Sequence, residues 1–273
     1  MSIIAISRGT FSGGEALAKR LAERLGYQCI SREMNLDAAA KEYGIPGAEL
    51  TAAMDKRPSY WDRVVGQSSA YLTFVRAALC EQAQGGKVVY HGHLGHLLLP
   101  GISHVIAVRV IADLEFRLTA AQQNQNLARD DALTYIKKVD AERQTWTRFL
   151  FDVEWDDPHL YDLVLKLSKM SLETACERVA HLTERPEFQP TAASLRAMQD
   201  LTLQSRVAAV LARDPRTREA ELAVTAEEGL VTITGTTSSA EVQEAVPLVA
   251  RRVAGVEEVQ AKVEFLPVYP PGT

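Results

Sequence analysis

A short run of small and hydroxyl residues near the start of the chain has the composition of a phosphate-binding loop. Residues 9–14 (GTFSGG) follow the apolar run 3–6 and precede a segment with Leu17, Leu21 and Leu25 at helical spacing. Backbone N–H groups of such a loop and the positive end of the following helix favour a bound anion. The sequence therefore predicts a site for nucleotide phosphates, with a glycine-rich connecting turn as the alternative. The candidate contacts are Arg8, Gly9, Thr10, Ser12, Gly13 and Gly14.

The loop departs from the usual phosphate-loop pattern, GxxxxGK[ST]. Laid on Gly9 and Gly14, the pattern puts Glu15 at its lysine and Ala16 at the hydroxyl residue that binds Mg²⁺. Glu15 would complement the helix dipole but repel phosphate. We expect Arg8 to supply the missing positive charge.

A carboxylate and a guanidinium stand three residues apart in a charged segment, 130–148, whose pattern predicts a helix. At this spacing Asp140 and Arg143 share a helix face, so together they could hold a nucleotide's base or sugar and its phosphate. A surface ion pair is the alternative. Arg117 lies in the helix predicted after the apolar strand 104–110, from which it could reach the phosphate.

These side chains need a scaffold that brings strand ends together. Over residues 1–182, short apolar segments alternate with helical ones, which is typical of an α/β fold with a parallel sheet. The predicted strands are 3–6, 27–30, 87–90, 104–110 and 160–167. Helices are predicted at Leu17–Leu25, 35–43, 61–84, from Asp113 onward, 130–148 and 171–182.

The pattern changes after residue 182. Residues 183–199 contain two prolines and no strong periodicity, which predicts a linker. Residues 200–267 read as helix, strand, strand, helix and strand, the order of a small α+β domain. Residues 268–273 are predicted to be a frayed tail.

The first 182 residues resemble the cytidylate-kinase-like branch of the P-loop nucleoside monophosphate kinases. The resemblance implies a P-loop kinase-type parallel sheet flanked by helices. It also implies ATP and Mg²⁺ as cofactors, and transfer of the γ-phosphate to a nucleoside monophosphate such as CMP. Four segments carry it: IAISRGTFSGGEALAKRLAERLG at 4–26, VVYHGHLG at 88–95, KKVDAER at 137–143 and WDDPHLYDLVL at 155–165.

The same resemblance implies roles for individual residues. Arg117, Arg129 and Arg143 would neutralise the transferring group, and Arg32, His93 and Asp140 would contact the acceptor. His93 stands where the family has an arginine, and Arg32 where it commonly has an acidic residue. For both, packing or solvent exposure is the alternative. His91, His93 and His96 are not expected to bind a metal, because no carboxylate accompanies them.

Residues 200–267 resemble a BON domain, through VAAVLARDP, LAVTAEEGLVTITGTTSSAEVQEAV and ARRVAGVEEVQAKVEF. Such domains bind phospholipid surfaces or partner proteins. Six arginines could form a basic face for acidic lipid or a partner, a solvated helix surface being the alternative. They are Arg206, Arg213, Arg216, Arg218, Arg251 and Arg252.

Composition limits the classes of function. The net charge of −5 argues against nucleic-acid binding as the main role. Three widely spaced cysteines indicate buried thiols in a reducing compartment. No apolar run approaches the roughly 20 residues of a membrane span, and the start of the chain lacks the pattern of a signal peptide. We therefore expect a cytoplasmic protein.

The most economical interpretation is a nucleotide-binding protein, an ATP-dependent monophosphate kinase with a degenerate phosphate loop and an attached BON domain. A catalytically inactive nucleotide sensor or adaptor that acts through the BON domain is the main alternative. A purely structural interaction protein is the third. The sequence leaves the acceptor nucleotide, the BON ligand and the oligomeric state open.

Overall fold

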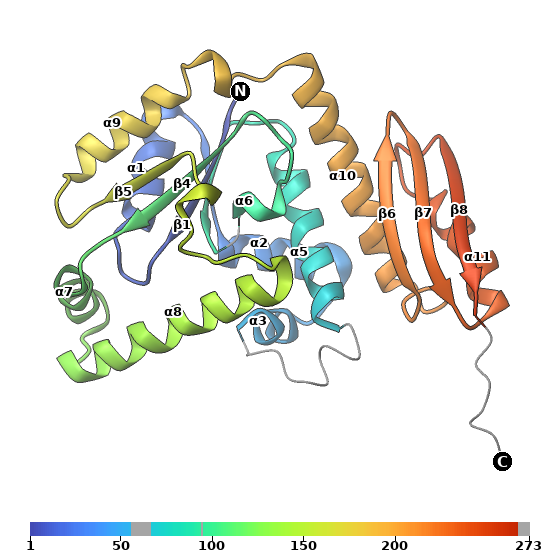
Figure 1. Cartoon of the computed structure of the whole chain (residues 1–273), viewed down its shortest axis with the longest axis horizontal. Helices are drawn as coiled ribbons and strands as arrows, with labels where there is room; N and C mark the ends of the chain where they lie inside the picture. The colour runs from blue at the N-terminus through green and yellow to red at the C-terminus, as the bar shows by residue number, and fades with distance from the viewer. Residues whose placement is uncertain (56–66, 94, 267–273) are drawn as a thin grey trace.

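The structure is a computed structural model that describes residues 1–55, 67–93 and 95–266. Two parts lie side by side, a five-stranded sheet with its helices and a three-stranded sheet, and helix α10 stands between them (Figure 1). The start of the helix predicted over 61–84 and the tail predicted over 268–273 lie outside the described residues.

The predicted parallel sheet is confirmed. All neighbouring strands pair in parallel, in the order β2-β3-β1-β4-β5. Central β1 has β3 on one side and β4 on the other, so its carboxyl end lies at the point where strand order reverses, where open α/β sheets bind ligands. The strands are β1 (Ile3–Arg8), β2 (Gln28–Ser31), β3 (Val88–Gly92), β4 (Val105–Ile111) and β5 (Leu163–Lys166).

Helices cover both faces of this sheet, because its strands are apolar on both sides. Within β1, Ile4 and Ile6 pack with Leu17 and Leu21 of α1, whereas Ile3 belongs to the core on the opposite face. One face carries α1 (Gly14–Leu25) and α9 (Leu172–Leu182). The other carries α2 (Arg32–Tyr43), α5 (Gln67–Ala83), α6 (Gly95–Leu98) and α10 (Ala192–Arg213).

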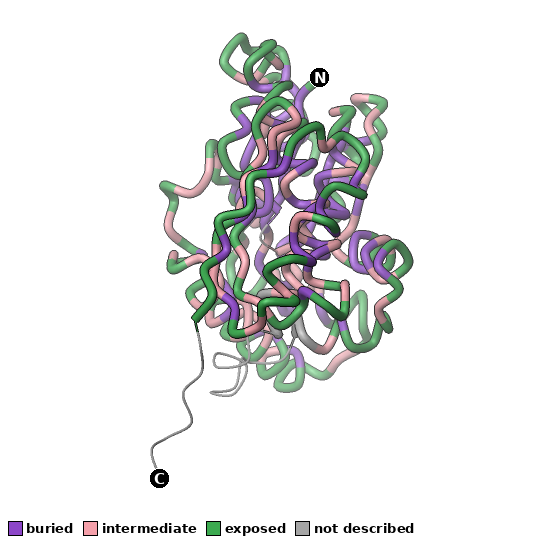
Figure 2. Tube along the Cα trace, turned by 90° about the vertical axis from the view of Figure 1, so that its right-hand side faces the viewer, coloured by how far each residue is buried: buried purple, intermediate pink, exposed green. Residues whose placement is uncertain are grey.

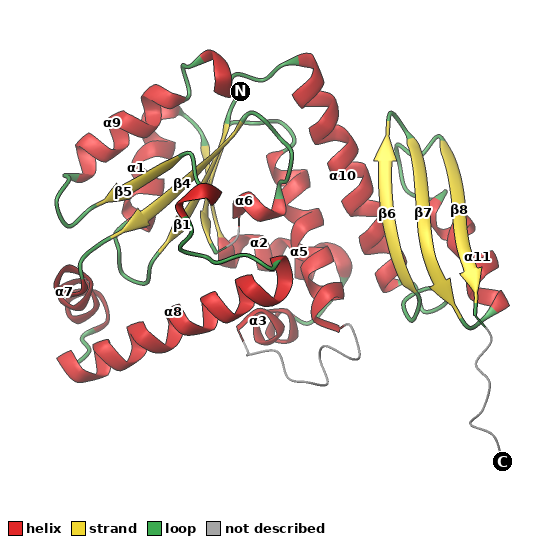
Figure 3. Cartoon of the chain, in the orientation of Figure 1, coloured by secondary structure: helices red, strands yellow, loops and turns green. Residues whose placement is uncertain are grey.

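A pair of helices, α7 (Leu114–Gln125) and α8 (Arg129–Phe151), follows β4 and approaches the loop after β1. Figure 3 shows α8 as one long helix running beneath the sheet. The two helices pack through a small apolar cluster to which Phe11 of the loop is added. The cluster contains Leu118, Ala121, Ala132 and Ile136. It holds the elements that carry Arg117, Asp140 and Arg143 next to the loop.

The structure differs from the linker predicted over 183–199. The segment holds a short 3₁₀ helix (Pro186–Phe188), and α10 already begins at Ala192. Thr191 caps α10 in a reciprocal capping box with Ser194. This pattern marks the start of a helix, but the two nearby prolines outweighed it in the linker prediction. A short helix α3 (Gly47–Asp55) was also not predicted.

Helix α10 belongs to both parts of the molecule. Met198, Leu201 and Ala209 pack into the core beneath α2 and α5. Leu203, Val207 and Leu211, at a spacing of four, enter the C-terminal core instead. Two apolar stripes on one helix therefore join the domains without an extended connection.

The predicted C-terminal α+β domain is confirmed. Its strands run in the order β6-β7-β8, with β6 antiparallel and β8 parallel to β7. The elements are β6 (Glu221–Glu227), β7 (Leu230–Thr237), α11 (Ala240–Ala250) and β8 (Glu258–Phe265). Figure 2 shows buried residues gathered in the interior and exposed ones outside. No helix among the described residues is both long and apolar enough to cross a membrane.

Candidate functional site

The loop between β1 and α1 turns sharply at two residues with left-handed backbone, Phe11 (φ 59°) and Gly13 (φ 87°). Its middle is fixed by Ser12, whose N–H donates to the Gly9 carbonyl (3.1 Å) and whose hydroxyl donates to that of Val110 (3.2 Å). Gly13 is the N-cap of α1 and offers no side-chain cap. The first N–H groups of α1 are therefore left for an incoming anion.

This geometry corrects the placement of the phosphate-loop pattern. The second glycine of the pattern stands where the loop turns into the helix. That residue is Gly13, since α1 begins at Gly14. In this register Gly14 takes the lysine position, Glu15 takes the hydroxyl position, and Arg8 takes the position of the first glycine.

Asp140 of α8 is bound to the loop. Its carboxylate accepts hydrogen bonds from the N–H (3.2 Å) and the hydroxyl (2.7 Å) of Thr10. Arg117 donates to the same carboxylate and, through Nε, to the Thr10 carbonyl (2.7 Å). An amide, a hydroxyl and a guanidinium thus converge on an anionic group, which is the set of donors that a phosphate would use.

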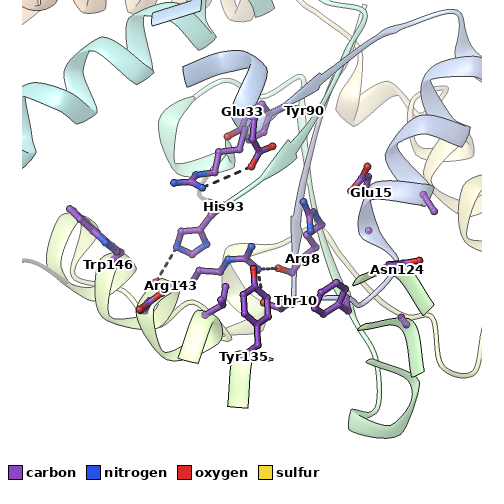
Figure 4. A pocket seen from close by; sticks show the side chains of 18 of the residues that line it. Arg8, Thr10, Glu15, Glu33, Tyr90, His93, Asn124, Tyr135, Arg143 and Trp146 are labelled. Carbon is purple, nitrogen blue, oxygen red and sulfur yellow. Dashed lines mark hydrogen bonds and ion pairs between the residues drawn. The ribbon is translucent and has the colours of Figure 1, made fainter. Parts of the chain in front are cut away.

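Arg143 lies beside this contact. Its Nη1 donates to the Arg8 carbonyl (3.1 Å) and to the Thr10 hydroxyl oxygen (3.2 Å), as Figure 4 shows. Burial, followed by the positive charge of Arg8, lowers the pKa of Arg143 to about 10, and Arg32 and Arg109 act in the same direction. Positive charge at this end of the sheet exceeds what Asp140 balances, so an anion would be stabilised there.

A cavity of about 980 Å³ opens in front of these residues. That volume is at the upper end of the range for small-molecule sites, roughly 300–1,000 Å³. One wall comes from α2 and α5, with Leu36, Leu72 and Val75, and the opposite wall from α7 and α8. The loop and α1 form the floor, so three of the four segments that carry the family resemblance reach one cavity (Figure 4), whereas no residue of 155–165 lines it.

Of the three predicted acceptor contacts, Asp140 lies at the loop and the other two lie apart from it. Arg32 is the first residue of α2, capped by Ser31, rather than the end of a strand. Both Arg32 and His93 line the cavity. The Nε2 of His93 is 3.0 Å from the Arg143 carbonyl oxygen and 3.0 Å from the Thr147 hydroxyl oxygen. Burial, and then the charge of Arg143, hold the pKa of His93 well below its usual value, so His93 cannot replace an arginine's charge.

Arg129 is not brought to the cavity. It lies exposed at the start of α8, where it pairs with Glu115 of α7 (2.6 Å). The catalytic role that the family resemblance implies for Arg129 is not supported by this position, because Arg129 is not among the residues that line the cavity. Among the described ranges, no group of three His, Cys, Asp or Glu side chains is arranged to hold a metal ion.

The comparisons with known proteins identify the family of this chain. Residues 3–169, more than half of the chain, match the cytidylate kinase-like family. The chain belongs to that family. A protein named cytidylate kinase from Ignicoccus hospitalis is 26% identical over 184 residues, covering 67% of this chain and 99% of the relative. One of the same name from Methanocaldococcus jannaschii is 24% identical over 173 residues, covering 63% and 91%.

Two further matches complete the description of this cytidylate kinase-like chain. The crystal structure of an uncharacterized protein from Eubacterium ventriosum is similar with a TM-score of 0.52 at 20% identity, covering 67% of this chain and 99% of that one. This likeness supports the fold. Residues 199–267 match the BON domain, which confirms the resemblance seen in the sequence.

Several residues of this family member reach the cavity without having been predicted. Lys19 lies one turn after Glu15 on α1 and pairs with it (2.8 Å), a contact that the i,i+4 spacing could have revealed. This pairing lowers the pKa of Glu15. Asn124 and Tyr135 also line the cavity, from the end of α7 and from α8, and no local pattern marks them; Lys138, from the segment 137–143, lines it too.

Proposed function

We propose that the protein transfers the γ-phosphate of ATP to a nucleoside monophosphate such as CMP. The observation that carries the proposal is the group of arginines around the loop. Arg143 donates a hydrogen bond to the Arg8 carbonyl oxygen, and Arg117 pairs with Asp140, which is bound to Thr10. Phosphoryl transfer depends mainly on positioning and on such neutralising charges. The homology to proteins named cytidylate kinase supports CMP as the first acceptor to test.

The proposed roles follow the two sides of the cavity. The N–H groups of residues 9–14 bind the donor phosphates, while Arg117 and Arg143 neutralise the transferring group from α7 and α8. Arg32 faces the acceptor from α2. An oxygen of the acceptor phosphate bonds to the γ-phosphorus as the bond to the β–γ bridging oxygen breaks, and ADP leaves with that electron pair.

Asp140 must change partners in this scheme. Its carboxylate holds the Thr10 amide and hydroxyl, so a donor phosphate arriving at the loop competes for both groups. Once displaced, Asp140 would be available to a ribose hydroxyl or to Arg143 on the same helix face. This is the acceptor role that the sequence predicted for it.

Mg²⁺ usually binds through substrate phosphates and one or two carboxylates, keeping several waters. Glu15, exposed in the first turn of α1 and lining the cavity, is the carboxylate that the loop offers for this purpose. Bound there, Mg²⁺ would supply further neutralisation of phosphate charge.

Nucleotide binding is tested first by thermal unfolding with millimolar ATP–Mg²⁺. A ligand at one hundred times its Kd stabilises by about 2.7 kcal/mol, so the melting temperature is expected to rise by several degrees. A coupled assay with CMP, dCMP, UMP and AMP then measures turnover. An unchanged melting temperature at about 5 mM ATP–Mg²⁺ would rule the proposal out.

One observation favours the sensor alternative. Helix α10 packs against α5 and α2, which form a wall of the cavity, and its other face belongs to the C-terminal core. Occupancy of the cavity could therefore be transmitted to the BON domain. Saturable ATP binding without turnover on any monophosphate would favour this function over the kinase.

For the BON domain, we propose a protein partner rather than an anionic membrane. The open face of the sheet exposes four glutamates and one lysine, Lys262, so the face is net negative. An anionic bilayer would repel this negative charge. The four glutamates are Glu221, Glu227, Glu258 and Glu264. Of the six arginines considered for a basic face, Arg206 pairs with Glu81 and Arg216 with Asp214, so their charges are partly balanced by this chain's own carboxylates. Co-sedimentation of the full chain with phosphatidylserine vesicles would contradict this choice.

A further inference from the structure

The phosphate loop carries its two unusual residues at complementary positions. With Gly13 as the turning residue, Arg8 stands where the pattern has its first glycine, and Gly14 stands where the pattern has its lysine. A cation and a glycine have thus changed places relative to the pattern. If the two substitutions were independent, residues 8 and 14 would not be expected to contact each other.

In the structure the two positions are in direct contact. A Cβ atom added to Gly14 would lie 2.6 Å from the Cβ and 2.9 Å from the Cδ of Arg8. Both distances are shorter than side-chain carbons tolerate, so the stem of Arg8 fills the space of a side chain at position 14. Gly14 has ordinary backbone geometry, since it is absent from the residues with positive φ. The steric demand of Arg8, rather than the backbone, therefore requires glycine.

The head group of Arg8 is placed for an anion. Arg8 lines the cavity, and Figure 4 shows it beside the loop with Glu15 and Arg143 as neighbours. Its Nε is buried without a hydrogen-bond partner, and no ion pair to Arg8 occurs in the part of the chain that the structure describes. The nearby carboxylates have other partners, because Glu15 is held by Lys19 and Asp140 by Arg117.

We propose that Arg8 contacts the transferred phosphate in place of the phosphate-loop lysine, and that Gly14 is glycine because the stem of Arg8 occupies its side-chain space. The proposal rests on the proposed function. It makes the loop a rearranged catalytic site rather than a degenerate one, since the charge enters from the end of β1 instead of the start of α1. The guanidinium also offers two parallel donors to phosphate oxygens, where lysine offers a point charge.

The test compares ATP and ADP affinity, because a contact to the terminal phosphate favours ATP. Arg8→Met keeps the stem over Gly14 and removes the charge. Calorimetry is expected to show ATP–Mg²⁺ affinity at least tenfold weaker, ADP affinity changed less than threefold, and turnover about 10²–10³-fold lower. Arg8→Lys should retain most of the ATP preference. Arg20→Met, an exposed arginine of α1 paired with Glu173, is the matched control and should bind as the wild type does.

The exchange itself provides the sharper experiment. Arg8→Gly alone should lose ATP preference, and Gly14→Lys alone should lose it through the clash with Arg8. The double variant Arg8→Gly/Gly14→Lys restores the usual pattern and should bind ATP at least tenfold more tightly than Arg8→Gly.

Outcomes separate this proposal from the proposed function. Wild-type protein that binds no ATP overturns the proposed function and this inference with it. Wild-type binding together with unaltered ATP preference in Arg8→Met overturns this inference alone. If Arg8→Met does not fold, Arg8→Gly decides in its place, because loss of ATP preference supports the proposal and its retention overturns it.

Discussion

The two domains of this protein use their interiors differently. In the first, seven residues among those described bury a side-chain nitrogen or oxygen without a hydrogen-bond partner, including Arg8, His93 and His96. In the described part of the second, no such atom occurs, and its core is aliphatic, built around Val207, Ile233 and similar residues. A buried polar group without a partner costs about 1–3 kcal/mol. Stability alone would not retain such groups.

The difference teaches where chemistry is to be expected. Three of these seven residues line the cavity, and they are Arg8 at the end of β1, His93 just after β3 and Trp146 on α8. Perturbed charges of this kind cluster at functional sites. The second domain has the opposite arrangement, because its interior is apolar and its polar residues are on the outside. This arrangement suits a module that binds through its surface.

The strongest test of this contrast is the loss of a cavity arginine. Arg143→Met removes the donor to Thr10 and Arg8, so turnover on CMP is expected to fall about 10²–10³-fold while the fold is retained. A coupled kinase assay and circular dichroism measure the two. Arg129→Met, on the same helix but paired with Glu115 at the surface, is the control. Equal losses in both variants would show that the cavity is not the site.

A substitution in the core of the C-terminal domain should have the opposite result, a loss of stability without a loss of ATP affinity. Ile233 is fully buried, so Ile233→Ala should lower the free energy of unfolding by about 2–5 kcal/mol, and Ile233→Val by about 1 kcal/mol. ATP affinity should stay within threefold of wild type, as measured by calorimetry at a temperature where both variants are folded. A larger change in affinity would mean that the two interiors are coupled, as the sensor function requires.

Acid sensitivity should belong to the first domain, which contains all six histidines. Burial lowers the pKa of His96 to about 4, and neither ring nitrogen has a partner. Below about pH 6.5 the His96 side chain binds a proton in the unfolded chain but not in the folded chain. The free energy of unfolding therefore falls as the pH falls toward 4. His96→Leu should recover on the order of 1–2 kcal/mol at pH 5, by urea unfolding.

Two further measurements frame that result. At pH 8 the gain from His96→Leu should be smaller, because folded and unfolded chains are then both unprotonated at this position. In the same urea unfolding, the stability of the wild type should fall between about pH 6.5 and pH 4 more steeply than that of His96→Leu. A pH-independent effect of His96→Leu would mean that packing, rather than proton binding, explains it.

The smallest expected effect concerns the junction. Arg206 of α10 pairs with Glu81 of α5 at 2.7 Å, with both side chains about one-third exposed. Arg206→Met should lower stability by about 1 kcal/mol or less. Unfolding should remain a single transition, because α10 contributes to both cores. Tryptophan fluorescence, which reports the first domain, and circular dichroism, which reports both, should coincide. Separate transitions would show that the shared helix does not unite the domains.

Local sequence patterns predicted most of the fold. Alternation of apolar strands and helices identified the parallel sheet, and the period of two over 256–265 identified β8. The linker prediction failed at its second half because two prolines outweighed the capping signal of Thr191 and Ser194. Proline and glycine mark interruptions, but they do not show that the next helix packs onto an existing core.

The site was predictable to the extent that it is local. The spacing of Asp140 and Arg143 placed them on one face of a helix, yet only the tertiary fold brings Asp140 to Thr10, 130 residues away. The tandem Gly13 and Gly14 allowed two registers of the phosphate-loop pattern, and only the start of α1 distinguishes them. The contact between Arg8 and Gly14 is likewise invisible to spacing.

The shared helix α10 also has a consequence for synthesis on the ribosome, where domains fold from the amino terminus as they emerge. The core beneath α2 and α5 needs Met198, Leu201 and Ala209, which are made last among its members. Until residue 209 has left the ribosome, the growing sheet keeps an open apolar side. The first domain thus cannot finish folding before the first helix of its neighbour exists, and the two domains complete their folding together.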